Sequence, residues 1–261
     1  MPRRSSAAEV ERRRQEALRL VTEEGEIRID MLAAMLGISL MTAHRDLDDL
    51  QARNLLQKKR GTAAAFTPVE READLRLREH DNLDFKRAAA GPLQEVVSPG
   101  DTVLLDCGST LFPFAAALGS VPRLRVVTTS LRVSYLLSES SVDVTLLGER
   151  FFPEFESCAG PEVLRQLDRF RIDVAFLTAT CVQDGGLSHP VRDYAENKEG
   201  FLKVAARTVL AVDHTKFGRT ATYAYGRISD YDLLVTDAAA PADELRQARS
   251  ARVQVRELVV D

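Results

Sequence analysis

Apolar residues in the first part of the chain recur at the spacing of amphipathic helices. A stretch covering residues 9–24 carries one such stripe, formed by Val10, Ala17, Leu18 and Val21. Two shorter stripes follow it, formed by Leu32, Met35 and Leu36 and by Leu40, Leu47 and Leu50. Apolar stripes so close in sequence are buried most simply against one another. The pattern therefore predicts a compact bundle of three helices.

The residues between the second and third predicted helices have the chemistry of a tight turn. Gly37 stands where the second helix should end, because glycine readily adopts the left-handed backbone of a helix end. Ser39 offers a hydroxyl to cap the next helix. This is the layout of a helix-turn-helix that reads DNA, and its outward side chains are Met41, Thr42, His44 and Arg45. The alternative is an ordinary solvated helix face.

A predicted β-hairpin, the wing, follows the helices. An apolar pair runs into three cations and a turn at Gly61, the cations being Lys58, Lys59 and Arg60. A short segment at residues 27–29 can pair with its strands, so residues 1–67 would form a winged helix-turn-helix with phosphate contacts from the wing. Further clustered cations near the N-terminus are Arg3, Arg4, Arg12, Arg13 and Arg14.

Residues 68–90 are rich in charge and contain spaced leucines at 75, 77 and 83. We interpret them as a linker that runs into one or two helices. Such a segment can transmit a change between domains, although a solvated helix is the simpler interpretation.

The remainder, residues 91–261, alternates short aliphatic runs with helical stretches. The predicted strands cover residues 102–106, 124–129, 143–148, 172–179, 208–213 and 231–237, with a further candidate at 252–260. The predicted helices cover residues 111–118, 131–140, 161–170, 194–207 and 242–250. Strands that alternate with helices build an open, mainly parallel α/β sheet, which we expect to be a second domain.

Three of the predicted strands end in polar residues, at the edge where such sheets bind ligands. The first loop contains Asp106, Gly108, Ser109 and Thr110, the second contains Thr128, Thr129 and Ser130, and the third contains Asp213 and Lys216. Hydroxyls and free amides before a helix favour an anion, typically phosphate. Each loop alone is as consistent with helix capping, but three loops at one edge favour a binding site.

Glu196 and Lys198 lie at the start of another predicted helix, after a polar loop. A carboxylate and an ammonium two residues apart can support proton transfer on a sugar, can grip hydroxyls and phosphate, or can form an ordinary surface ion pair. His189 and His214 lack the serine or cysteine partner pattern of a nucleophilic triad, so we interpret them as polar loop residues.

The composition is ordinary for a globular protein, with 261 residues, 45% hydrophobic and 28% charged. The net charge is −4, yet the first 67 residues are net positive. We see neither a signal peptide nor a membrane-spanning run, so we expect a cytoplasmic location without membrane contact. Cys107, Cys158 and Cys181 are far apart and lack metal-binding spacing, so we expect free thiols, no metal and no cofactor.

Five motifs together carry a resemblance to a known family. They cover residues 39–50, 105–110, 127–131, 196–198 and 213–218. They resemble the DeoR family of bacterial transcription regulators, and the similarity runs from about Arg12 to Asp237. The resemblance implies a winged helix-turn-helix joined to a sensor domain similar to ribose-phosphate isomerases. It also implies a homo-oligomer that represses carbohydrate genes until a phosphorylated sugar binds.

Several positions depart from the pattern of this family. Thr129 replaces an asparagine, and glycines are replaced by Glu149, Thr178 and Cys181. These changes predict an altered effector pocket, since Glu149 adds bulk and negative charge where a phosphate would bind. His44 replaces an arginine beside Arg45 and Thr62 replaces a wing glycine, which should change the sequence that is read rather than whether DNA is bound.

We therefore expect a repressor that binds double-stranded operator DNA through Ser39, the outward residues of the reading helix and the wing cations. We expect it to bind a small phosphorylated sugar through the three loops together with Glu196 and Lys198. A rival hypothesis is a sugar-phosphate isomerase with Glu196 or Asp173 as base and Lys198 or Lys216 steadying charge. A third is an N-terminal domain that docks a protein and never contacts DNA.

Overall fold

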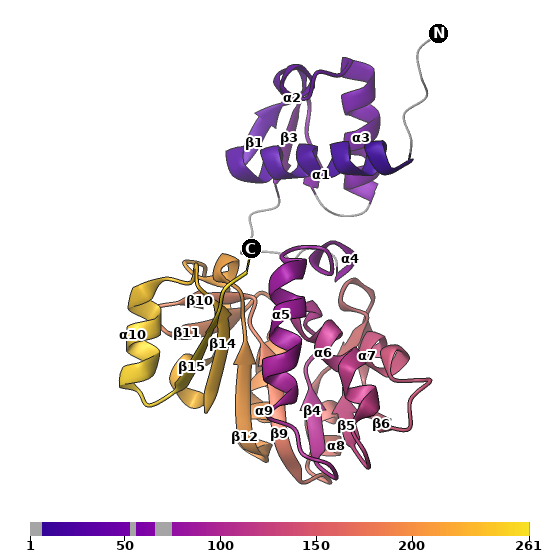
Figure 1. The fold of residues 1–261 in the computed structure, drawn as a ribbon. Coiled ribbons are helices and arrows are strands. Elements are labelled where there is room, and N and C mark those ends of the chain that lie inside the picture. Colours follow the sequence, from indigo (N-terminus) through magenta and orange to yellow (C-terminus); the bar gives the residue numbers. More distant parts are fainter. Residues whose placement is uncertain (1–6, 53–55, 66–74, 261) are drawn as a thin grey trace. The chain divides into compact units, whose positions relative to one another are not determined.

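The computed structural model describes residues 7–52, 56–65 and 75–260, and the chain divides into two compact units (Figure 1). The N-terminal unit comprises residues 1–74 and the C-terminal unit comprises residues 75–261. Each unit has a hydrophobic core of its own, so each can be understood as a separate domain.

The N-terminal unit is a winged helix-turn-helix, as predicted. Its described helices are α1 (Ala7–Glu24), α2 (Ile29–Met35) and α3 (Leu40–Ala52). Its described strands form an antiparallel sheet in the order β1-β3-β2 and are β1 (Glu26–Arg28), β2 (Leu56–Lys58) and β3 (Thr62–Ala65). The predicted pairing of residues 27–29 with the wing is confirmed, because Ile27 lies opposite Ala63.

The core of this unit uses the predicted apolar stripes only in part. Leu32 and Leu47 are fully buried where the helices meet. Met35 is 54% exposed and Leu40 is 49% exposed, so the prediction that both face the core is wrong. The reason is the turn: α2 ends at Met35 and the chain reverses at Gly37, whose φ is +63°, so both side chains flank the turn.

A buried cluster of charged side chains joins α1 to α3. The Asp46 carboxylate accepts hydrogen bonds from Arg13 Nε at 2.6 Å and from Arg14 Nε at 3.2 Å, and it is almost fully buried. The hydrogen bond to Asp46 raises the pKa of Arg13 above its ordinary value. Two arginines of the clustered cations near the N-terminus therefore stabilise the helix bundle.

The described strands of the C-terminal unit include a parallel seven-stranded sheet in the order β15-β14-β12-β9-β4-β5-β6. These strands are β4 (Thr102–Leu105), β5 (Arg125–Thr128), β6 (Asp143–Leu146), β9 (Ile172–Thr178), β12 (Ala205–Ala211), β14 (Leu233–Asp237) and β15 (Gln254–Leu258). The predicted open α/β sheet is confirmed. Because β5, β4, β9 and β12 are neighbours, the loops that follow them share one edge of the sheet.

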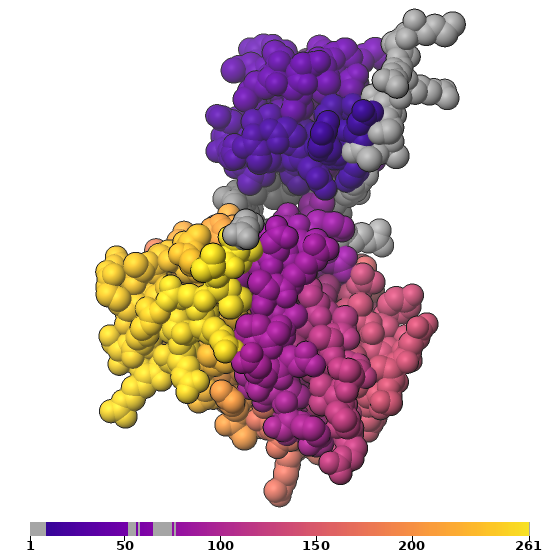
Figure 2. All heavy atoms as spheres, in the orientation of Figure 1, coloured from indigo at the N-terminus to yellow at the C-terminus, as the bar shows by residue number. Residues whose placement is uncertain are grey.

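Helices cover both faces of this sheet (Figure 1). One face packs against α5 (Leu83–Gln94), α6 (Phe112–Ala117) and α7 (Leu131–Leu136), and the other against α8 (Pro161–Leu167), α9 (Arg192–Val204) and α10 (Ala242–Ser250). Residues of β4 alternate between the two buried clusters, since Val103 and Leu105 join the first and Leu104 the second. Figure 2 shows α5 running between the C-terminal segment and α6.

The charged segment before the sheet contributes to the core of the C-terminal unit. Leu75 of α4 (Leu75–Arg78) and Phe85, Ala89 and Leu93 of α5 are all buried. The simpler interpretation of a solvated helix therefore does not hold for α5, because its apolar side packs on the sheet. The rest of the predicted linker, residues 68–74, lies outside the described residues.

Short antiparallel strands in this unit were not predicted. β7 (Arg150–Phe152) pairs with β8 (Ser157–Ala159), and a separate sheet contains β10 (Cys181–Gln183), β11 (Gly186–His189) and β13 (Tyr223–Arg227). These short strands mix polar, charged, aromatic and glycine residues, so they lack the aliphatic runs that marked the strands of the large sheet.

Candidate functional site

The beginning of α3 presents the side chains predicted to read DNA. Ser39 caps the helix, because the Thr42 amide donates to Ser39 Oγ at 3.2 Å and the two hydroxyl oxygens lie 2.8 Å apart. Met41 is 79% exposed, and Arg45 is exposed one turn later. Thr42 and His44 lie beside them and are half-buried. The structure thus places all five predicted residues at one end of α3.

Two of the three wing cations already have acidic partners. Lys58 Nζ lies 2.5 Å from Asp48 Oδ1 of α3, and Lys59 Nζ lies 3.2 Å from Glu26 Oε2 of β1. Arg60 is exposed, and no ion pair joins it to another described residue. The two lysines would have to exchange a carboxylate for a phosphate to contact DNA, which costs little for exposed pairs.

Asp106 and Lys198 form a buried ion pair at the carboxyl end of the large sheet. Asp106 directly follows β4, and Lys198 reaches it from the middle of α9. The Asp106 carboxylate also accepts hydrogen bonds from the Thr178 amide at 3.0 Å and the Thr178 hydroxyl at 2.8 Å. Lys198 Nζ donates to the Thr178 carbonyl at 2.9 Å. The pair therefore ties together the ends of β4 and β9 and the helix that follows them.

The charges of this pair are maintained by its contacts. Burial by itself would raise the pKa of Asp106 and lower the pKa of Lys198. The opposite charge and the hydrogen bonds outweigh burial, so the pKa of Asp106 lies below its ordinary value and the pKa of Lys198 above it. Both groups stay charged near neutral pH, which suits binding or structural support better than proton transfer.

A second polar cluster surrounds Ser109 and Asp213. Lys86 of α5 is only 3% exposed, and its Nζ donates to Ser109 Oγ at 3.1 Å. Asp213 Oδ1 accepts a hydrogen bond from Asn82 Nδ2 at 2.9 Å. Lys216 lies in the turn after Asp213, close enough for its charge to act on Lys86. The structure thus brings together predicted residues from the loops after β4 and β12, and α5 adds a lysine to them.

The predicted residues after β5 take part in bonds within the fold. Thr128 Oγ1 donates to a main-chain carbonyl of β4 at 2.8 Å. Ser130 Oγ accepts from the Val133 amide at 3.2 Å and so caps α7. Thr129 Oγ1 accepts from Ser157 Oγ at 3.2 Å. The alternative interpretation, helix capping and local structure, fits Thr128 and Ser130 well.

Two side chains fill space in the predicted effector loops. A Cβ atom added to Gly108 would lie 2.0 Å from Thr178 Oγ1, so Thr178 packs tightly against the loop that also contains buried Thr110. Glu149 Oε2 accepts a hydrogen bond from the Glu162 amide at 2.5 Å and so occupies the start of α8. Both residues were singled out because they replace glycines, and each now occupies space that a glycine would leave open.

Two residues predicted for the sugar chemistry lie elsewhere. Glu196 pairs with Arg192 at 2.7 Å on the outside of α9, whereas Lys198 points inward, since residues two apart face different sides of a helix. Asp173 accepts from the Thr102 amide at 2.8 Å, and both residues lie at the amino ends of their strands. Neither carboxylate lies beside Lys198, so the form of the isomerase hypothesis that pairs one of them with Lys198 lacks the geometry it required.

The two histidines were expected to be polar loop residues, and one of them differs from that expectation. His189 is buried, and its ring centroid lies 5.9 Å from that of Phe155 and 5.2 Å from that of Tyr194. His214 Nδ1 lies 3.0 Å from Asp237 Oδ1. The interpretation is therefore wrong for His189, whose ring belongs to an aromatic cluster.

The three cysteines, all of them described, form no disulfide, as expected. Burial and the neighbouring charge of Asp106 raise the pKa of Cys107 to about 12, so its thiol stays protonated. Among the described residues no group of three His, Cys, Asp or Glu side chains is arranged to hold a metal ion. None of the described helices is long and apolar enough to cross a membrane.

Lys86 and Asn82 were not predicted as site residues, and Thr178 was predicted only as a departure from the family pattern that alters the effector pocket. Lys86 and Asn82 lie in the charged segment, where the sequence suggested solvated helix. The available signal was the pair Phe85 and Ala89, four residues apart, which indicates that one side of this helix is buried. Thr178 lies at the carboxyl end of β9, the position at which such a sheet places its ligand contacts.

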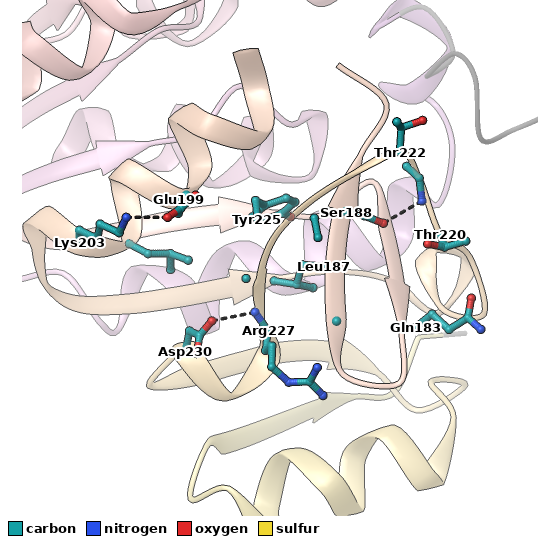
Figure 3. A pocket seen from close by; sticks show the side chains of 15 residues that line it. Gln183, Leu187, Ser188, Glu199, Lys203, Thr220, Thr222, Tyr225, Arg227 and Asp230 are labelled. Atoms are coloured by element: carbon teal, nitrogen blue, oxygen red, sulfur yellow. Dashed lines mark hydrogen bonds and ion pairs between the residues drawn. The ribbon is translucent and has the colours of Figure 1, made fainter. Parts of the chain in front are cut away.

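A hollow of about 750 Å³ lies beside the small sheet, between β11, β13 and α9 (Figure 3). Its wall includes the ion pair of Glu199 with Lys203, whose atoms are 2.6 Å apart. Tyr225 also lines it and donates from its hydroxyl to the Thr178 carbonyl at 3.3 Å. None of the predicted effector residues lines this hollow, so it is a separate place from the two polar clusters.

Both units match models of known domains. Residues 13–69 match the DeoR-like helix-turn-helix domain, and residues 81–238 match the DeoR C terminal sensor domain. The chain belongs to the DeoR family. The HTH-type transcriptional regulator GlpR of Haloferax volcanii is 30% identical over 93% of this chain and 96% of its own. The glycerol-3-phosphate regulon repressor of Escherichia coli is 27% identical over 91% of this chain and 95% of its own.

Two solved structures align with part of this DeoR-family chain. Ribose 5-phosphate isomerase A from Methanocaldococcus jannaschii aligns with a TM-score of 0.39 and 20% identity, over 52% of this chain and 55% of that chain. The match thus spans about half the length of the isomerase. The probable sor operon regulator from Shigella flexneri aligns with a TM-score of 0.36 and 12% identity, over 53% of this chain and 77% of that chain.

Proposed function

We propose that this DeoR-family protein is a cytoplasmic repressor of carbohydrate genes that leaves its operator when a phosphorylated sugar binds the C-terminal unit. It binds double-stranded DNA as a homodimer or a larger homo-oligomer. The observation that carries the proposal is the capped and exposed start of α3 beside a cationic wing. The names of the relatives support it, since one is a glycerol-3-phosphate regulon repressor.

In this proposal the beginning of α3 enters the major groove. Met41, Thr42, His44 and Arg45 contact base edges, with Ser39 holding the helix start in place. Lys58, Lys59 and Arg60 contact phosphates and supply affinity that does not depend on sequence.

The effector binds at the carboxyl end of the large sheet. Ser109 and Lys216 contact its anionic group, and Asp213 contacts its hydroxyls, because these residues converge from two loops. The wall of the proposed site is formed by Asp106, Lys198, Gly108, Thr110 and Thr129. Glu196 is left out, since its carboxylate lies on the outside of α9.

A titration of the full-length protein on the DNA upstream of its own gene tests both halves of the proposal. It is run at fixed near-physiological salt with random-sequence competitor, and with glycerol 3-phosphate or other sugar phosphates added one at a time. Specific binding that one sugar phosphate weakens is the expected result. Specific binding that no sugar phosphate changes would contradict the effector. Absence of salt-dependent DNA binding, or turnover of the sugar phosphates, would contradict the repressor itself.

A further inference from the structure

The main-chain carbonyl of Arg78 is held by the second polar cluster. Ser109 Oγ donates to this carbonyl at 3.0 Å, and the buried ammonium of Lys86 donates to it as well. Lys86 Nζ also donates to Ser109 Oγ at 3.1 Å, so the three groups form a closed triangle. Arg78 is the last residue of α4. A proposed effector residue therefore holds the end of this short helix.

Other contacts of α4 come from the same edge of the sheet. Glu79, which follows α4, accepts from Arg132 Nε at 2.8 Å, and Arg132 lies in the first turn of α7, directly after the loop of Thr129 and Ser130. The Arg78 guanidinium lies 5.6 Å from the centre of the Phe155 ring. The contacts of α4 and of Glu79 thus include Ser109 and Lys86 of the proposed effector site and Arg132 beside the loop after β5.

The position of α4 in the chain gives these contacts a consequence. The N-terminal unit ends at Asp74, and α4 begins at Leu75. Anything that changes how firmly α4 is held acts on the segment that leads directly from the DNA-binding unit into the sensor unit.

The Arg78 carbonyl is a weak partner for the positive charges around Ser109. Lys86 is buried, and burial together with the charge of Lys216 lowers the pKa of Lys86 to about 8. The described residues provide no ion-pair partner for the Lys216 ammonium, which is half-buried. The Arg78 carbonyl offers the Lys86 ammonium only a partial negative charge, and the charges of Asp81 and Asp213 act on Lys86 without accepting a hydrogen bond from it among the described contacts. Hydrogen bonds from an ammonium to an ionised oxygen are roughly twice as strong as bonds between neutral groups.

Asp213 is already engaged next to these cations. Its Oδ1 accepts from Asn82 Nδ2 at 2.9 Å and from the Thr215 amide at 2.9 Å. Both donors hold the carboxylate in the turn after β12. Lys86 itself has its hydrogen bonds to Ser109 and Arg78, so the place that an incoming anion would take is the one occupied by the Arg78 carbonyl.

We propose that a phosphate group binds Lys86, Ser109 and Lys216 in place of the Arg78 carbonyl, and that this exchange releases α4. Lys86 is then both an anion ligand and the residue that holds the connecting segment in the absence of effector. The inference rests on the proposed effector site and adds to it the ligand lysine and the element that moves.

Hydrogen–deuterium exchange of the full-length protein tests the release. The amides of Glu79 and His80 donate to the carbonyls of Leu75 and Leu77 at 2.8 Å and 2.9 Å, so their exchange reports on α4. The probes are glycerol 3-phosphate and inorganic phosphate, with chloride at the same ionic strength as the reference. Exchange of residues 79–80 should become about tenfold faster with either phosphate while the sheet strands keep their protection.

Variants separate this inference from the proposed repressor function. Lys86→Met should give fast exchange at residues 79–80 without any ligand and should no longer respond to phosphate. Ser109→Ala removes one donor to the Arg78 carbonyl, keeps the lysine, and should give an intermediate rate; it serves if Lys86→Met does not fold. Lys203→Met is the matched control, because this lysine is exposed on α9 and its partner Glu199 lies outside the cluster.

The outcomes of these experiments are distinct. Phosphate that binds, as measured by calorimetry, but leaves the exchange of residues 79–80 unchanged or slower would overturn the release of α4. Unchanged exchange in both Lys86→Met and Ser109→Ala would overturn the role of the triangle. A third outcome is fast exchange in these variants while operator binding by the natural protein does not change with any sugar phosphate. This outcome would contradict the proposed effector, but it would support the role of Lys86 and Ser109 in holding α4.

Discussion

Arg45 in the N-terminal unit and Lys198 in the C-terminal unit are both cations at the centre of a predicted site, in opposite surroundings. Arg45 is exposed on α3, and no ion pair joins it to another described residue. Lys198 is buried and fully engaged with Asp106 and Thr178. A charge in water is free to meet an external partner, whereas a buried charge must have its partner inside the protein.

This contrast separates binding from stability. Replacing a cation of the exposed surface should change the affinity for DNA and leave the fold intact, because such a cation loses its bound water only when the complex forms. Replacing a cation of the buried clusters should change folding first and ligand binding second. The two units therefore call for different measurements.

The largest effect is expected for Lys198→Met, which leaves the Asp106 carboxylate buried without its cation. The free energy of unfolding should fall by about 3–5 kcal/mol, the cost typical of breaking one side of a buried pair. Urea unfolding of the full-length protein, followed by circular dichroism, measures it. The matched control Lys203→Met should change stability by less than about 0.5 kcal/mol, since Lys203 is exposed.

The free energy of unfolding should also depend on pH differently in the natural protein and in Lys198→Met. The pKa of Asp106 is lowered in the folded protein, so its contribution is present above the ordinary value of 3.8 and is lost as the pH falls through the lowered pKa. In Lys198→Met this carboxylate should instead be stabilised by protonation, and the variant should lose less stability on acidification than the natural protein. A parallel loss in both proteins would contradict the buried pair.

The next largest effect is expected for Arg45→Ala at the surface. If Arg45 contacts a base, binding to the preferred operator should weaken by about 1–3 kcal/mol, with little change on random DNA. Lys59→Ala should weaken both kinds of DNA equally and reduce the salt dependence by about one ion. Both variants should unfold at the same urea concentration as the natural protein. Equal losses on operator and random DNA for Arg45→Ala would sink its assignment as a reading residue.

A smaller effect is expected from the titration of Lys86. Its pKa of about 8 is lowered by burial and Lys216, and Arg78 acts in the same direction, while Asp81 and Asp213 raise it. A bound phosphate favours the ammonium, so affinity for glycerol 3-phosphate should fall by about tenfold between pH 7 and pH 9 as the free site loses its proton. Calorimetry at both pH values measures it. Lys86→Met should show a flat profile, and a flat profile in the natural protein would rule out this lysine as a ligand.

The smallest effect is expected for Asp48→Asn. Asp48 pairs with Lys58 at 2.5 Å, and its side chain is exposed on the same helix as Arg45. Removing its charge frees Lys58 and takes a negative charge from the DNA-facing surface, so all DNA should bind more tightly by less than about 1 kcal/mol. The gain should shrink at high salt. Weaker binding would mean that the Asp48–Lys58 pair positions the wing.

Much of the fold follows from local patterns. The winged helix-turn-helix and all seven strands of the parallel sheet were predicted, because the helices carry apolar stripes at helical spacing and the strands stand out as short aliphatic runs between them. Met35 and Leu40 were misplaced because a turn between helices changes the direction of the stripe within a few residues. The short strands β7, β8 and β10 were missed because they contain no aliphatic run that would set them apart from loops.

The candidate site was predicted less completely. The convergence of Ser109, Asp213 and Lys216 follows from the rule that loops at the carboxyl ends of parallel strands are neighbours. Glu196 was assigned beside Lys198 from closeness in sequence, yet the turn of the helix separates them. Lys86 was missed because its partners lie far away in sequence.

The sequence by itself determined which elements form, that a DNA-reading helix is joined to an open α/β sheet, and which loops carry polar residues, because periodicity, turn residues and capping act over a few neighbouring positions. Only the tertiary structure decided which polar residues meet. Lys198 reaches Asp106 across 92 residues and Lys86 reaches Ser109 across 23, and such pairs depend on strand order and on which face of a helix packs inward. Both pairs are buried, and a charge that is removed from water requires a partner inside the protein.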